Sequence, residues 1–336
     1  MSVMLSVTGP SLWRKGGAES TKPSRFPFAR RLGMESDMKI AAPLSALLLA
    51  LPLPACAQPA PAPAATAQDA DPALWVVKDK DTTIYLFGTI HVLKPGLSWF
   101  DEAVKTAFDR SQTLVLEMVE PDAATQQRVV SAAAFDPNGT PLTQQLSPNY
   151  RAAFAKAMGD GQVQPAVYEK MRPWFAAVTL SLLPVRQLGY DPANGPEKVL
   201  TDAAKAAGKP VVGLETFEGQ LGVFGKLSKP AQLQLLESTL DELPKVDATF
   251  TTLVDAWASG RPEGVAKEMN ESLKDSPEVA RVLLTDRNKQ WAAWIAERMK
   301  RPGTVFIAVG AGHLAGAGSV QDQLGSYKLK AVRVKY

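Results

Sequence analysis

The sequence predicts an α/β protein whose mostly parallel central sheet is formed from both ends of the chain, with an inserted, largely helical middle region. Three observations carry this prediction. A strand–helix–strand pattern occupies residues 82–117, and a buried type of strand lies near the other end, at residues 304–309. Between them, residues 121–300 have mainly helical patterns, interrupted by one helix-then-strand unit at residues 197–215.

The first elements in chain order form a hairpin. Residues 74–77 and 82–87 are rich in β-branched and aromatic side chains, and they flank a charged turn. A helix capped by Ser98, with Asp101 three residues later, is expected next. The continuous apolar run at residues 114–116 then returns as a strand parallel to the first.

The remainder of the chain follows the same logic. Apolar periodicity predicts helices within residues 121–185 and 220–300, and three strands follow helical segments. The expected later elements are a helix at residues 197–207, a strand at 211–215, a strand at 304–309, a short helix at 319–324 and a strand at 328–334.

The first 72 residues are not expected to belong to the folded domain. Residues 1–37 have no recognisable pattern and are interpreted as unstructured or as a mis-called start. Residues 38–57 combine a lysine, an apolar stretch of Ala, Leu and Pro, and a small-x-small ending, which is typical of a secretory signal peptide. Residues 58–72 form a linker rich in Pro and Ala. The domain is expected over residues 73–336.

This pattern predicts export to the bacterial periplasm or cell envelope. The apolar stretch is too short and too rich in proline for a transmembrane span. Two forms of processing remain open: cleavage after Ala57, or lipidation of Cys56, whose preceding residues resemble a lipobox. Cys56 is the single cysteine of the chain, so a disulfide, a thiolate metal site and a cysteine nucleophile are excluded from the mature domain.

The charge of the chain argues against a nucleic-acid partner. The formal net charge is +3, but the excess of basic residues lies in residues 1–57. The rest of the chain is close to neutral and carries no block of basic side chains. The expected partner is therefore a small molecule or a peptide that acts as substrate.

Two Gly-x-x-His motifs are the strongest chemical pattern. The two histidines of the chain, His91 and His313, each follow a glycine by three residues, Gly88 and Gly310, at the end of a buried strand. Gly312 lies within the second motif. A glycine at a strand end allows a sharp turn and a close approach of a ligand. An imidazole supplies a metal ligand or a proton carrier near neutral pH.

Two glutamates also follow strands. Glu117 and Glu215 come at the ends of apolar runs, and the carboxyl ends of parallel strands meet at one sheet edge. Two histidines with two carboxylates suit a divalent metal such as Mn, Co or Zn, or a metal-free base and acid acting on water. A serine nucleophile elbow and a dinucleotide-binding fingerprint are both missing from the sequence.

The chain resembles the TraB/GumN group, which is related to the TIKI metalloproteases and to the ChaN and erythromycin-esterase-like fold. The resemblance covers about residues 73–336. It rests on the segments Leu86-Phe87-Gly88-Thr89-Ile90-His91, Leu114-Val115-Leu116-Glu117, Met171-Arg172-Pro173-Trp174, Gly195-Pro196-Glu197, Gly208-Lys209-Pro210-Val211-Val212-Gly213-Leu214-Glu215-Thr216, Asp286-Arg287-Asn288 and Ala308-Val309-Gly310-Ala311-Gly312-His313-Leu314-Ala315-Gly316. Glu197 stands where the family often has Asp.

The resemblance implies a metal-dependent peptidase centre. On that pattern His91, Glu117 and His313 are metal ligands or catalytic residues. Arg287 and Asn288 occupy the position of the family's Arg-Asn pair. Arg287 is then expected to clamp a substrate carboxylate or phosphate or, equally, to form a salt bridge with a strand-end Glu.

Three functions follow from this site. The first is a metal-dependent hydrolase of the peptidase type, with Glu117 or Glu215 as general base. The second is a protein that binds heme, iron or a small ligand in the same pocket without turnover. The third is a metal-free, esterase-like hydrolase with His91 or His313 as base.

Overall fold

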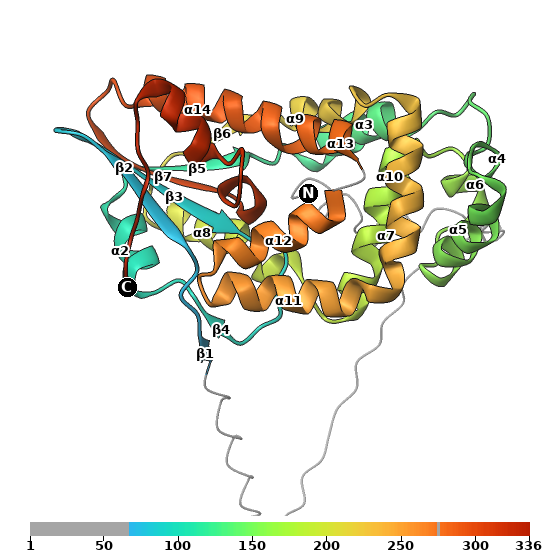
Figure 1. Ribbon diagram of the computed structural model, residues 1–336, viewed down its shortest axis with the longest axis horizontal. Coiled ribbons are helices and arrows are strands. Elements are labelled where there is room, and N and C mark those ends of the chain that lie inside the picture. The colour runs from blue at the N-terminus through green and yellow to red at the C-terminus, as the bar shows by residue number, and fades with distance from the viewer. Residues whose placement is uncertain (1–66, 274–275) are drawn as a thin grey trace, which may run out of the picture. The chain divides into compact units, whose positions relative to one another are not determined.

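The computed structural model describes residues 67–273 and 276–336 (Figure 1). A six-stranded sheet has the order β6-β5-β7-β3-β2-β8. The four strands β6, β5, β7 and β3 run parallel. At one edge β2 is antiparallel to β3, and β8 is antiparallel to β2. The strands are β2 (Leu74–Lys78), β3 (Thr82–Thr89), β5 (Thr113–Met118), β6 (Val211–Glu215), β7 (Gly303–Gly310) and β8 (Val332–Arg333).

The predicted sheet built from both ends of the chain is confirmed. Strand β3 pairs with β7 along its whole length, from Thr82 opposite Gly303 to Thr89 opposite Gly310. Strand β5 pairs with the other side of β7. The predicted strand–helix–strand unit therefore holds two parallel strands that are not neighbours, because the late strand β7 lies between them.

Helices cover both faces of the sheet (Figure 1). On one face, Trp291 and Ile295 of α14 (Asp286–Arg298) pack on Ile84 and Ile307 of the sheet. On the other face, buried residues of α2 (Glu102–Arg110) and α8 (Pro196–Ala206) join a core that includes Phe306. Alternate residues of each strand thus serve two separate cores, as a sheet buried on both sides requires.

The middle of the chain is helical, as predicted. Helix α7 is buried along most of its length and packs against α10 and α11 (Figure 1). The helices not yet placed are α3 (Ala123–Ala134), α4 (Leu142–Gln145), α5 (Pro148–Asp160), α6 (Pro165–Tyr168), α7 (Pro173–Gln187), η1 (Pro192–Asn194), α9 (Phe217–Gly225), α10 (Lys229–Glu242), η2 (Leu243–Lys245), α11 (Val246–Ala258), α12 (Pro262–Leu273), α13 (Pro277–Ala280), η3 (Arg281–Thr285), η4 (Ala311–Leu314), α15 (Val320–Leu324) and η5 (Gly325–Tyr327).

Two element boundaries differ from the prediction near the N-terminal side. Strand β1 (Gln68–Asp69) lies inside the predicted linker and pairs in parallel with β4 (Leu97–Ser98). This pairing keeps the backbone extended through Ser98, so helix α2 begins at Glu102 with Asp101 at its N-cap. The Ser98 hydroxyl donates a hydrogen bond to Asp101 instead of capping the helix.

The last strand is shorter than expected. Only Val332–Arg333 pairs with β2, because η5 occupies residues 325–327 and Lys328 then takes a left-handed conformation with φ of 59°. The predicted signal peptide, Cys56 and most of the predicted linker lie outside the described residues. Within residues 67–273 and 276–336, none of the helices has the length and apolar character needed to span a membrane.

Candidate functional site

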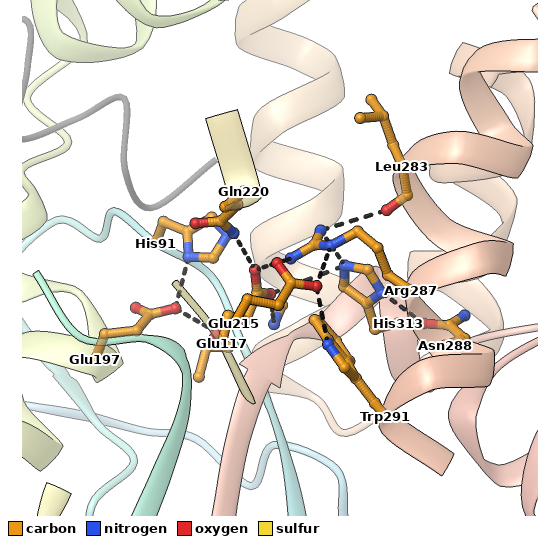
Figure 2. Close-up of polar contacts among 12 residues, drawn as sticks. His91, Glu117, Glu197, Glu215, Gln220, Leu283, Arg287, Asn288, Trp291 and His313 are labelled. Carbon is orange, nitrogen blue, oxygen red and sulfur yellow. Dashed lines mark hydrogen bonds and ion pairs between the residues drawn. The ribbon is translucent and has the colours of Figure 1, made fainter. Parts of the chain in front are cut away.

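The predicted site residues meet at one edge of the sheet, beyond the carboxyl ends of the parallel strands (Figure 2). His91 follows β3, Glu117 lies near the end of β5, and Glu215 ends β6. The fourth parallel strand, β7, ends at Gly310 and leads into η4, which carries His313. The topology therefore brings together residues that are more than 200 positions apart in sequence.

Glu117 is the buried centre of the cluster. Its Oε1 accepts a hydrogen bond from the Gly310 backbone N–H at 2.7 Å, and its Oε2 accepts one from Gln220 at 2.8 Å. Arg287 donates to the same Oε2 at 2.8 Å. Burial alone would raise the pKa of Glu117, but the charge of Arg287, with smaller contributions from the two histidines, lowers it well below its usual range. Glu117 is therefore a permanent carboxylate.

Arg287 uses its whole guanidinium inside the cluster. Nε and Nη2 donate to the two oxygens of Glu215 at 2.8 and 3.0 Å, and Nη2 also donates to Glu117. Nη1 donates to the Leu283 carbonyl at 3.3 Å and to His313 Nε2 at 3.1 Å. These five hydrogen bonds equal the number of N–H donors of an arginine. The predicted salt bridge between Arg287 and a strand-end Glu is thus present. Binding of a substrate carboxylate or phosphate by Arg287 stays a prediction, and it would require one of these hydrogen bonds to break.

The contacts of His313 fix its tautomer. Asn288 donates from Nδ2 to the Gly318 carbonyl at 2.9 Å, so its Oδ1 is the acceptor that faces His313 Nδ1 at 2.6 Å. The proton is therefore on Nδ1, and the Nε2 lone pair accepts from Arg287. Burial lowers the pKa of His313 to about 3 and outweighs the attraction of Glu117. His313 is a neutral residue that positions Arg287.

This neutral state makes the stability of the protein sensitive to mild acid. The unfolded chain takes up a proton on His313 below about pH 6.5, whereas the folded chain does so only near pH 3. We therefore expect the free energy of unfolding to fall from pH 6.5 downward, by at most about 1.4 kcal/mol per pH unit for this group. Urea unfolding at pH 7.0, 6.0 and 5.0 measures it. The variant His313→Gln should lose this part of the slope, and identical slopes in both proteins would contradict the assignment.

His91 pairs with Glu197 on one side of Glu117, and Arg287 and His313 lie on the other side (Figure 2). His91 Nδ1 lies 2.5 Å from Glu197 Oε1, which also accepts from the Thr89 hydroxyl at 2.5 Å. Burial would raise the pKa of Glu197, but the charge and the hydrogen bond of His91 lower it. Because a carboxylate only accepts hydrogen bonds, Nδ1 of His91 carries the proton and Nε2 carries the lone pair.

Gly310 lies close to Glu117, His91 and His313, with little room for a side chain. A Cβ atom on this residue would lie 3.1 Å from Glu117 Oε1, 3.4 Å from His91 Nε2 and 3.6 Å from the His313 ring. The other two motif glycines have different surroundings. A Cβ on Gly88 would meet the Ala311 backbone at 3.1 Å, and one on Gly312 would meet the Met269 side chain. Gly310 is thus the motif glycine that lies directly against Glu117 and both histidines, where a side chain would crowd them.

A cavity of about 420 Å³ opens onto the cluster. Its floor includes His91, Glu117, Gly310 and His313. Its wall is mainly apolar and comes from the helical middle region, with residues such as Val223, Phe224, Leu235, Val246, Phe250, Leu253 and Leu283. A concave apolar cavity that ends on a few convergent polar groups is the usual form of a small-molecule site.

The predicted metal ligands do not form a ready set of three. His91 Nε2 and Glu117 Oε1 both lie next to Gly310, but the lone pair of His313 Nε2 is already used by Arg287. Arg287 also supplies the positive charge that balances Glu117. In the described part of the chain, no cluster of three or more His, Cys, Asp or Glu side chains is arranged to hold a metal ion. As they stand, the side chains fit a guanidinium and not a divalent ion.

Sequence reasoning missed three members of the site. Glu197 holds His91, Gln220 holds Glu117, and Trp291 donates from Nε1 to Glu215 at 2.9 Å. The ring of Trp291 also lies against His313, with 4.3 Å between the ring centres. Glu197 was visible in the sequence, as an acidic residue in the Gly195-Pro196-Glu197 motif at the start of a helix. Gln220 and Trp291 had no comparable pattern.

The fold and the site together define a class of protein: an α/β domain with a buried carboxylate–arginine–histidine cluster under an apolar cavity. Residues 73–331 match the model of the TraB/PrgY/gumN family, and the chain belongs to that family. It is 24% identical over 257 residues to the uncharacterized protein YbaP of Escherichia coli (strain K12), covering 75% of this chain and 92% of the relative. An uncharacterized protein of Treponema pallidum (strain Nichols) is 22% identical over 266 residues, covering 74% and 78% of the two chains. No solved structure matches this chain.

Proposed function

We propose that this protein is a hydrolase of an acyl bond, ester or amide, in which His91 acts as general base on a water molecule. The observation that carries the proposal is the pair formed by Glu197 and His91. The carboxylate fixes the tautomer and the orientation of the imidazole, and His91 lines the cavity next to Glu117 and Gly310. A histidine held in this way by a carboxylate is the arrangement used in many hydrolases.

The reaction needs only the atoms of water and substrate. His91 Nε2 takes a proton from water, and the oxygen attacks the acyl carbon to form a tetrahedral intermediate. The intermediate breaks its bond to the leaving group, which receives the proton from His91. The products are a carboxylic acid and an alcohol or amine. Glu197 stabilises the imidazolium that forms for a moment between these two steps.

Glu117 and Arg287 have an electrostatic role in this proposal. Glu117 is a weak base, because its pKa is lowered, and its negative charge lies near His91. Arg287 keeps Glu117 ionised and in place through a buried ion pair. Glu215 and His313 in turn hold the guanidinium from two other directions.

A metal-dependent hydrolase is the second candidate, and the observation that favours it is that His91, Glu117 and His313 line the same cavity. Mn, Co or Zn is the expected ion, with His91, Glu117 and His313 as ligands. A bound ion would supply Lewis-acid chemistry at that position. For this to occur, Arg287 Nη1 must first leave His313 Nε2.

One experiment separates the two candidates. Purified protein is assayed with p-nitrophenyl octanoate before and after dialysis against EDTA, and its metal content is measured in parallel. The general-base proposal expects hydrolysis that survives EDTA in a metal-free sample and is lost in His91→Gln. Activity that disappears with the metal and returns with Mn, Co or Zn would instead establish the second candidate. A Soret band on addition of heme, without hydrolysis, would point to the ligand-binding function.

We also propose that the protein acts in the bacterial envelope. The support is the sequence pattern of residues 38–57, with an apolar stretch and a small-x-small ending before a linker rich in proline. N-terminal sequencing of the protein from fractionated cells tests this. A chain that starts at Gln58, or at a lipidated Cys56, is expected, and an unprocessed chain in the cytoplasm would contradict it.

A further inference from the structure

The side-chain amide of Gln220 has a fixed orientation. Its partner, Glu117 Oε2, belongs to a carboxylate whose pKa is held low, and a carboxylate can only accept hydrogen bonds. The NH₂ group of Gln220 must therefore face Glu117, at 2.8 Å (Figure 2). It follows that the carbonyl oxygen, Oε1, faces away from Glu117.

This carbonyl oxygen is a buried acceptor without a donor. Gln220 is 3% exposed and lines the cavity, and its Oε1 has no hydrogen-bond partner among the described residues. An unpaired buried acceptor is costly, and native proteins usually keep one only where a ligand or water supplies the donor. Turning the amide over would not solve this, because it would place the oxygen against the Glu117 carboxylate.

The rest of the cavity wall offers mainly apolar surface. Helices α7, α10 and α11 line it with aliphatic and aromatic side chains, while Gln220 enters from α9 close to the floor. Burial of an apolar group against this wall would favour binding. The cavity thus has a polar end, formed by the site, and an apolar body.

The charge of the cavity floor decides which kind of polar head group a ligand can place there. The buried cluster contains three carboxylates, those of Glu117, Glu197 and Glu215, and one guanidinium, that of Arg287. His313 is neutral, with a pKa of about 3. Because negative charge is in excess here, a carboxylate head group would be repelled, and no Arg287 N–H remains to receive it.

We propose that Gln220 Oε1 and the apolar wall form a recognition subsite for a ligand with an apolar body and an uncharged head group that carries an N–H or O–H donor. The donor binds Gln220 Oε1, and this places the head group beside His91. Gln220 is then a specificity residue that touches the substrate without taking part in proton transfer. This inference deepens the proposed hydrolase function by naming the substrate class, but it concerns binding and is tested without turnover.

The test compares three probes with the same chain: octanamide, N,N-dimethyloctanamide and octanoate. Binding to the full-length protein is measured by isothermal titration calorimetry, and it is repeated in His91→Gln, in which hydrolysis is removed. We expect octanamide to bind about tenfold more tightly than the dimethyl amide, which lacks the donor, as one buried hydrogen bond would give. Octanoate should bind more weakly than both.

Two variants separate the subsite from the general shape of the cavity. Gln220→Met removes the acceptor at similar volume and should abolish the preference for octanamide. Leu253→Ala, in the apolar wall, should weaken octanamide and the dimethyl amide by the same factor and keep the preference. Equal binding of these two amides to the unaltered protein would overturn the proposal, as would a preference that survives in Gln220→Met. If the protein prefers octanamide but hydrolyses no substrate, the result would support the subsite and refute only the proposed reaction.

Discussion

Replacing Arg287 by Met is expected to lower the free energy of unfolding by about 3–5 kcal/mol, the range for removal of one partner of a buried ion pair. The guanidinium balances Glu117 and Glu215, and all three side chains are about nine-tenths buried or more. Its loss leaves two carboxylates facing each other without a counter-charge. The pKa of Glu117 should rise in the variant, because its largest lowering influence has been removed. Urea unfolding followed by tryptophan fluorescence measures the loss.

The matched control is Arg281→Met. Arg281 forms an exposed ion pair with Asp286 at 2.5 Å, and pairs of this type contribute about 0–1 kcal/mol. The double variant Arg287→Met, Glu215→Gln should recover part of the stability, since it removes one of the unbalanced charges. A loss in Arg287→Met no larger than that in Arg281→Met would show that the buried cluster is not held by this arginine.

Replacing Glu197 by Gln is expected to reduce kcat for p-nitrophenyl octanoate by a factor of about 10²–10⁴, with a small effect on KM. The substitution keeps the size of the side chain but removes the charge that stabilises protonated His91. It also allows an amide N–H to face Nδ1, which would favour the wrong tautomer. Steady-state kinetics measures both constants, and the rate should return in Glu197→Asp to the extent that the shorter carboxylate still reaches His91.

Glu218→Gln is the control for this substitution. Glu218 lies on the surface of α9 and forms a long ion pair with Arg128 at 3.6 Å, so its variant should keep the original kcat. The thermal unfolding of both variants should be compared to separate folding from catalysis. An unchanged kcat in folded Glu197→Gln would remove the carboxylate–histidine pair from the mechanism.

The sequence was sufficient to predict the sheet and the edge at which the site lies. Strand-end positions of His91, Glu117 and Glu215 follow from short apolar runs, and parallel strands bring their carboxyl ends together. The order of the strands in the sheet was harder to predict, because no local sequence pattern indicates that β7 lies between β3 and β5. The short pair β1–β4 was missed because two residues in a polar, proline-rich stretch carry no periodicity.

The roles of the site residues were less accessible than their positions. The two Gly-x-x-His motifs look equivalent in sequence, but Glu197 orients His91 whereas Asn288 and Arg287 occupy both nitrogens of His313. This asymmetry comes from neighbours that are distant in the chain. Gln220 was invisible for the same reason, because a lone glutamine on an apolar helix is recognisable only from its contacts.

The pairing of β3 with β7 has a consequence for when the candidate site can form during synthesis of the chain. Strand β7 starts at Gly303, so the ribosome must have synthesised more than nine-tenths of the chain before the centre of the sheet can close. Contacts of such large sequence separation form slowly. Until β7 is synthesised, β3 and β5 each keep the edge that pairs with β7 unpaired. A chain that ends just before Gly303 would carry His91 and Glu117 but would lack His313 and the Gly310 N–H that binds Glu117. Premature termination anywhere along the helical region should therefore leave no residual activity.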